Sequence, residues 1–148
     1  MDRARRAGIR TTVLRNPADA DELLATLADA DLVVLAGYLK LLPAPVVRRF
    51  RQRAINIHPA LLPAFGGPGM YGRRVHEAVL ASGATESGAT VHYVDEQFDR
   101  GPIIAQRTVP VLPDDTADSL AHRVLEVEHE LLPQAVLDLA TRLREREP

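Results

Sequence analysis

The stretch that decides the fold is Asp31-Leu32-Val33-Val34-Leu35-Ala36-Gly37-Tyr38, a continuous β-branched and aliphatic run that a glycine closes. A run without polar alternation is typical of a parallel strand that is buried on both faces. The carboxyl end of such a strand is also where open α/β sheets bind their ligands. We therefore start from this strand and ask what surrounds it.

Helical and strand patterns alternate on both sides of this run. Leucines at helical spacing predict a helix over residues 17–29, and residues 11–14 could form a short strand before it. Downstream we expect a helix over 45–50, a strand over 54–58 and a helix over 73–81. This order favours an α/β protein with an open, mainly parallel twisted sheet and helices on both faces.

The pattern changes after Asp99. Residues 103–111 read as one extended strand, which could form a hairpin with residues 91–94. Asp114-Asp115-Thr116 supplies cap residues for a long C-terminal helix. Its apolar stripe is Leu120, Val124, Val127 and Leu131, and we expect Pro133 to bend or break the helix.

The bulk composition narrows the classes of function. With 148 residues, 46% hydrophobic content and a formal net charge of −2, the chain predicts a single domain over 1–148. The near-neutral charge argues against nucleic acid as the main partner. The absence of cysteine excludes disulfides and thiolate nucleophiles.

Neither a membrane segment nor a metal site is expected. The longest apolar stretch, residues 32–42, is interrupted by Lys40 and is too short to cross a bilayer. No apolar segment follows the first residues as in a secretory signal, so we expect a cytoplasmic protein. No pair of histidines has convincing ligand spacing with a nearby carboxylate.

Polar chemistry is concentrated in Asn56-Ile57-His58-Pro59. If residues 54–58 form a strand, Asn56 and His58 project from the same face. A carboxamide donor beside a titratable ring can hold and polarise a carbonyl oxygen, which would make this a site. The alternative is a histidine at a strand end, followed by a proline-rich turn without chemistry.

A second polar segment covers residues 90–102. It predicts a strand followed by a loop with Asp95, Glu96 and Asp99, which ends in a Gly101-Pro102 turn. His92 lies close to this loop, so it could face the same cleft or could merely be buried and hydrogen-bonded.

A glycine-rich segment, Gly66-Gly67-Pro68-Gly69-Met70-Tyr71-Gly72, lies between the two polar segments and formally contains G-x-G-x-x-G. A dinucleotide fingerprint needs a strand that runs straight into the first glycine, and here Pro59 and Pro63 intervene. The remaining interpretations are a mobile loop that places Tyr71 over a ligand, or a flexible connector.

Together these three segments resemble the phosphoribosylglycinamide formyltransferase family, the folate-dependent enzymes of purine synthesis. The resemblance implies the formyltransferase fold and a catalytic trio of Asn56, His58 and Asp99. It also implies transfer of a formyl group from 10-formyltetrahydrofolate, a co-substrate, to the amine of glycinamide ribonucleotide without a metal. Reduced folate and the ribonucleotide would be its partners, and the protein would be a monomer or a homodimer.

The resemblance also implies two groups of binding residues. Those expected to bind folate are Tyr38, Leu39, Lys40, Leu41, Leu42, Val94, Asp95 and Phe98, and those expected to bind the ribonucleotide are Ile57, Pro59 and Glu128. Many family members have arginine at the position of Lys40, which changes the local contact. Without the resemblance, the leucines would be interpreted as core and Glu128 as a solvated helix flank.

In the mechanism that the resemblance implies, Asn56 and a protonated His58 donate hydrogen bonds to the oxyanion. Asp99 would raise the pKa of His58, orient its ring and help to move a proton.

The beginning of the chain differs from a complete fold of this kind. Residues 2–8 read as the tail of a helix that ends at a C-cap glycine, Gly8. The resemblance starts inside the family's second helix, so we expect that the first strand and the phosphate-binding loop precede Met1. The alternatives are a formyltetrahydrofolate deformylase, a methionyl-tRNA formyltransferase, or an inactive fragment that binds folate.

Overall fold

A mixed four-stranded sheet lies at the centre of the computed structural model, which describes residues 2–145. Its strands are β1 (Val33–Leu35), β2 (Ala54–His58), β3 (Glu86–Tyr93) and β4 (Ile103–Pro110), in the order β1-β2-β3-β4. The pair β1 and β2 is parallel, whereas β2 with β3 and β3 with β4 are antiparallel. The predicted hairpin onto residues 91–94 is confirmed, and the prediction of a mainly parallel sheet is wrong.

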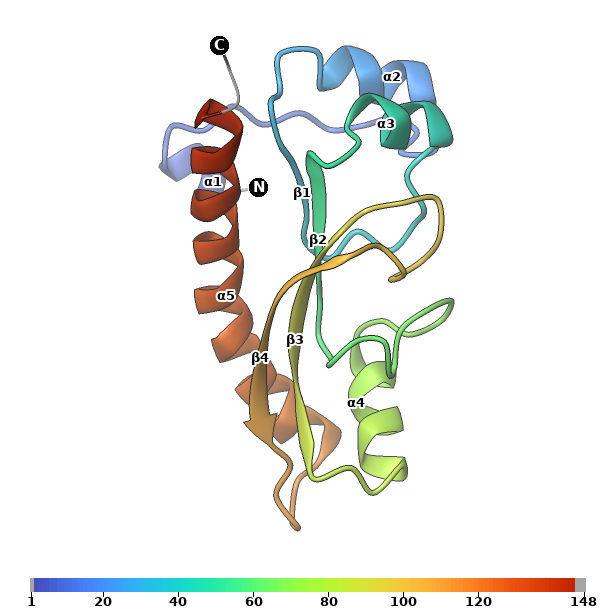
Figure 1. The fold of residues 1–148 in the computed structure, drawn as a ribbon, viewed down its shortest axis with the longest axis vertical. Helices are drawn as coiled ribbons and strands as arrows, with labels where there is room; N and C mark the ends of the chain where they lie inside the picture. Colours follow the sequence, from blue (N-terminus) through green and yellow to red (C-terminus); the bar gives the residue numbers. More distant parts are fainter. Residues whose placement is uncertain (1, 146–148) are drawn as a thin grey trace.

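The path of the chain after β2 explains this difference. Helix α4 (Arg73–Ala81) does not return along the sheet but continues beyond the end of β2 (Figure 1). β3 therefore begins at the end where β2 stops and runs back beside it. The loop over residues 94–102 then returns the chain beside β3, so β3 and β4 are antiparallel as well.

The remaining helices are α1 (Asp2–Arg6), α2 (Ala20–Thr26), α3 (Ala44–Arg49) and α5 (Ala117–Glu145). α2 is shorter than predicted because Asp19 caps its first turn, accepting hydrogen bonds from two backbone N–H groups. Gly8 has φ +72° after α1, as expected of a C-cap glycine. The strand predicted over residues 11–14 is wrong, because this segment pairs with none of the strands described between residues 2 and 145, and Val13 is 69% exposed.

Helices pack on both faces of the sheet, as predicted. Ile55 and Ile57 point to one face, where they share a core with α4 and α5. Val33 and Ala54 point to the other face, where they pack against α2 and α3. Alternation along β2 therefore assigns each strand residue to one of two separate cores.

α5 is one continuous helix of 29 residues that curves along its length (Figure 1). Leu120, Val124 and Leu131 are buried as predicted. Of the two outcomes predicted for Pro133, a bend or a break, the break does not occur. Proline removes one backbone donor, but the buried residues beyond it keep the last turns packed on the core. Within residues 2–145, no helix is long and apolar enough to cross a membrane.

Candidate active site

A cavity of about 490 Å³ lies at the carboxyl ends of the parallel pair β1 and β2 and extends to the N-terminal half of α5. It is lined by all the predicted site residues: Asn56, His58, Asp99, Tyr38, Leu39, Lys40, Leu41, Leu42, Val94, Asp95, Phe98, Ile57, Pro59 and Glu128. Segments as distant as α5 and the loop after β1 thus meet in one place. The roles assigned to the individual residues in catalysis and in binding stay predictions.

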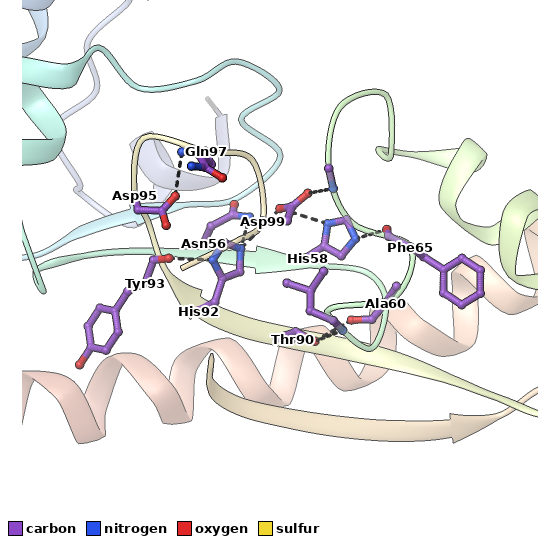
Figure 2. Close-up of polar contacts among 12 residues, drawn as sticks. Asn56, His58, Ala60, Phe65, Thr90, His92, Tyr93, Asp95, Gln97 and Asp99 are labelled. Atoms are coloured by element: carbon purple, nitrogen blue, oxygen red, sulfur yellow. Dashed lines mark hydrogen bonds and ion pairs between the residues drawn. The ribbon is translucent and has the colours of Figure 1, made fainter. Parts of the chain in front are cut away.

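His58 ends β2 and is 97% buried, and two contacts fix the orientation of its ring (Figure 2). Its Nε2 lies 2.8 Å from the carbonyl oxygen of Phe65. A carbonyl can only accept a hydrogen bond, so Nε2 carries a proton. The other ring nitrogen, Nδ1, lies 3.5 Å from Oδ1 of Asp99 and is the atom that gains or loses the second proton.

Asp99 connects three parts of the site. Its Oδ2 accepts a hydrogen bond of 3.0 Å from the backbone N–H of Gly67, in the glycine-rich loop. Its Oδ1 lies 3.5 Å from both His58 Nδ1 and His92 Nε2. The backbone of Asp99 has φ +54°, a left-handed conformation that aspartate tolerates better than most residues.

Burial and polar contacts have opposing effects on the pKa values of Asp99 and His58. Burial raises the pKa of Asp99, but the contact with His92, the hydrogen bond from the Gly67 N–H and the nearby imidazole of His58 outweigh it, so this pKa lies below its usual value. For His58, burial lowers the pKa and outweighs the raising effects of Asp99 and the Phe65 carbonyl. Asp99 thus raises the pKa of His58 as expected, but burial outweighs this effect and favours the neutral imidazole.

His92 faces the same cleft, which decides between the two interpretations of this residue. It stands opposite Asn56 in the β2–β3 pairing and is 97% buried. Its Nε2 lies 3.1 Å from Asn56 Nδ2, and its Nδ1 lies 2.8 Å from the carbonyl oxygen of Tyr93 (Figure 2). The sequence could not show this, because the contact depends on the antiparallel register.

The turn after β2 is held by a buried hydroxyl. Thr90 Oγ1 donates to the carbonyl of Ala60 and accepts from the N–H of Leu62 and the amide of Gln106. These bonds fix the chain between His58 and the Phe65 carbonyl that orients its ring.

At the far end of β3, a Cβ on Gly101 would lie 1.7 Å from the carbonyl oxygen of Tyr93, so only glycine fits there.

The glycine-rich loop forms one wall of the cavity. Gly67, Gly69, Met70, Tyr71 and Gly72 all line it, which favours the interpretation of a ligand-facing loop over that of a connector. No strand runs directly into this loop, so the dinucleotide fingerprint has no support.

The remaining predicted binding residues differ in how far they belong to the cavity. Leu42 is only 6% exposed and packs mainly in the core between α2 and α3, whereas Leu39 and Leu41 are exposed. Glu128 reaches the cavity from α5, and burial raises the pKa of its carboxyl. It is thus not a freely solvated helix flank.

Several groups at the site were missed by sequence reasoning. The Phe65 carbonyl and the Gly67 N–H belong to the main chain, so no side-chain pattern indicates them. His76 on α4 also lines the cavity and is 95% buried, and its Nδ1 has no hydrogen-bond partner among residues 2–145. Within the described residues, no group of three or more histidine, aspartate or glutamate side chains is arranged to hold a metal ion.

Comparison with known proteins agrees with this geometry. The model of the formyl transferase family matches residues 4–136. The solved structure of phosphoribosylglycinamide formyltransferase from Brucella melitensis is 41% identical with a TM-score of 0.83, and the match covers 94% of this chain and 73% of that one. The chain belongs to the phosphoribosylglycinamide formyltransferase family. The resemblance inferred from the sequence and the formyltransferase fold are confirmed.

Two curated members of this family show how much of a relative the chain represents. The chloroplastic phosphoribosylglycinamide formyltransferase of Vigna unguiculata is 58% identical over 108 residues, which are 73% of this chain and 35% of that protein. The enzyme of Mycobacterium tuberculosis is 47% identical over 127 residues, which are 83% of this chain and 57% of that protein. The chain thus spans about a third to somewhat over half of these relatives.

Proposed function

We propose that this protein transfers a formyl group from 10-formyltetrahydrofolate to the primary amine of glycinamide ribonucleotide, a step of purine synthesis. The observation that carries the proposal is the convergence of Asn56, His58 and Asp99 on one cavity, with Asp99 3.5 Å from the titrating nitrogen of His58. Membership of the formyltransferase family supports the same reaction class.

The two substrates would approach this trio from opposite sides. Folate would occupy the side formed by residues 38–42 and by Val94, Asp95 and Phe98, where exposed leucines offer an apolar wall. The ribonucleotide would occupy the side formed by Ile57, Pro59 and Glu128. The formyl carbon and the amine would then meet beside Asn56 and His58.

The reaction exchanges one carbon–nitrogen bond for another. The amine lone pair attacks the formyl carbon, and the carbonyl electrons move onto the oxygen. The tetrahedral intermediate then breaks the bond to N10 of the folate. One proton leaves the attacking nitrogen and one reaches N10, so atoms and charge balance without a further reactant.

Asn56 and His58 would serve different parts of this step. An amide N–H of Asn56 donates to the developing oxyanion, a contact whose loss typically costs about 100- to 1000-fold in rate. Burial lowers the pKa of His58 and favours the neutral ring, so its Nδ1 lone pair can accept the proton from the amine. The carboxylate of Asp99 then stabilises the imidazolium, which can return the proton to N10 directly or through water.

The test is a product assay with the full chain and 10-formyltetrahydrofolate. Formylated ribonucleotide that appears only when the amine substrate is present supports the proposal. Release of formate without an amine would indicate a deformylase instead. Folate binding without turnover would indicate a binding fragment.

Two further measurements test the remaining proposals. Size-exclusion chromatography with light scattering, on the same preparation, tests whether the protein is a monomer or a homodimer. Cell fractionation tests whether it is cytoplasmic.

A further inference from the structure

We propose that His92 is a positioning residue for formyl transfer: it holds the Asn56 carboxamide with its nitrogen toward β3, so that the second N–H of this amide is free for the substrate. The inference rests on the proposed function for the meaning of that N–H. Its structural basis is the pairing of two buried side chains across β2 and β3.

The first step concerns the ring of His92. Its Nδ1 lies 2.8 Å from the carbonyl oxygen of Tyr93, and because this oxygen can only accept, Nδ1 is protonated in either charge state. Gly101 permits the close chain approach on the other side of the same carbonyl. In the neutral ring, Nε2 therefore has a lone pair and no proton.

The second step concerns the amide of Asn56. Its Nδ2 lies 3.1 Å from Nε2 of His92, and the lone pair there accepts one of the two amide protons. Among the described residues, Asn56 makes no other side-chain hydrogen bond, and it is only partly buried at the cavity wall. One amide N–H is thus committed to His92, and the other remains available to an incoming oxygen.

The third step is the alternative that His92 excludes. Besides the Asn56 amide at 3.1 Å, Nε2 faces Oδ1 of Asp99 at the longer distance of 3.5 Å. If Nε2 carried a proton for Asp99, it could not accept from Asn56, and the amide would turn its oxygen toward the ring. This orientation would change the groups that the amide offers to the cavity. A carboxamide oxygen near a developing oxyanion repels it, whereas an N–H stabilises it. The tautomer of His92 thus decides which group Asn56 presents.

Nuclear magnetic resonance tests this arrangement without turnover. In the full chain labelled with ¹⁵N at histidine, long-range proton–nitrogen spectra at mildly alkaline pH should show His92 as the Nδ1–H tautomer. Labelling of asparagine should show one Asn56 amide proton that shifts when His92 is changed to phenylalanine. A His92 in the Nε2–H form, or an Asn56 amide that does not respond, overturns the proposal.

Kinetics then test the consequence for the reaction. We expect His92→Phe to lower kcat by about 10- to 100-fold, as expected when an oxyanion donor is misoriented, and to leave the KM for folate within about 2-fold. His92→Gln, whose carbonyl oxygen can accept the same amide proton, should recover part of the loss. Ser87→Ala is the matched control, because Ser87 lies on β3, is 98% buried and has a hydroxyl without a partner in the described part of the chain.

A double-mutant cycle identifies the residue through which His92 acts. In an Asn56→Ala background, the His92→Phe change should cost less than about 2-fold more, because its target is gone. An undiminished loss in that background, or coupling to Asp99→Asn in place of Asn56→Ala, overturns the proposal. If the unmodified chain forms no formylated product, the proposed function fails, and the spectra alone still decide whether His92 holds Asn56.

Discussion

The two faces of β2 and β3 differ in what they bury. On one face Ile55, Ile57, Ala89 and Val91 are buried in the core beneath α4 and α5. On the other, Asn56, His58, Thr90 and His92 are mostly buried as well, although all four are polar. Alternate residues of the same two strands thus form the hydrophobic core on one face and a buried polar cluster on the other.

Hydrogen bonds make the polar face possible. Burial of an unpaired polar group costs about 1 to 3 kcal/mol, so such a face persists only if its groups find partners. Here His58 pairs with the Phe65 carbonyl, Asn56 with His92, and Thr90 with the turn after β2. The apolar face needs only shape and volume, whereas the polar face needs particular atoms at particular distances.

The largest effect is expected from changes at the reacting end of the polar face. His58→Ala and Asp99→Asn should each lower formyl transfer by about 100-fold or more while folate binding changes little, because these groups act on charge that develops during the reaction. Asparagine also tolerates the left-handed backbone at position 99. Steady-state kinetics and folate titration measure both quantities. Asp114→Asn, an exposed change, is the control. Near-normal turnover in either variant contradicts the assignment.

The apolar face should respond in stability and not in chemistry. Ile55 is fully buried, so Ile55→Ala should lower the free energy of unfolding by about 2 to 5 kcal/mol through lost contacts and a cavity. Urea denaturation measures this, with Leu137→Ala, at a position that is 64% exposed, as the control. A loss below about 1 kcal/mol would show that the two faces are less distinct than their burial indicates.

An intermediate effect is expected where the polar face is purely structural. Thr90→Val keeps the side-chain shape but leaves the Leu62 N–H and the Ala60 carbonyl without their partner. We expect a loss of about 1 to 3 kcal/mol in unfolding free energy. Thr108→Val, at an exposed position of β4, should change it by less than about 0.5 kcal/mol. Equal losses of unfolding free energy in Thr90→Val and Thr108→Val would contradict the conclusion that the Thr90 hydrogen bonds stabilise the turn.

The smallest effect concerns pH. Burial lowers the pKa of His58 and of His76, so below about pH 6.5 the unfolded chain binds more protons and the free energy of unfolding falls. The lowered pKa of Asp99 affects stability only in stronger acid. Its contribution to the free energy of unfolding is fully present above about pH 3.9 and is lost as the pH falls below that value. We expect the Tm to decrease by roughly a few degrees from about pH 7.5 to about pH 5.5. His76→Phe should reduce this decrease, and an unchanged slope would contradict the assignment.

Local patterns predicted the elements on which the site is built. The bounds of β2 and α4 agree with the sequence prediction, and alternation placed Asn56 and His58 on one face. The strand over residues 31–38 was predicted too long, and the one over residues 11–14 does not exist, because apolar runs do not reveal whether a pairing partner is available. The Asn-x-His pattern and the acidic loop together indicated the family.

The sequence by itself determined that Asn56 and His58 share one face of β2 and which segments carry the polar chemistry, because side-chain periodicity is a local property. Only the tertiary structure decided the direction of β3, and with it the placement of His92 opposite Asn56. The tertiary structure also brought the Phe65 carbonyl and the Gly67 N–H to His58 and Asp99. Strand direction and main-chain partners depend on how distant segments pack, and these contacts leave no periodic signal in the chain.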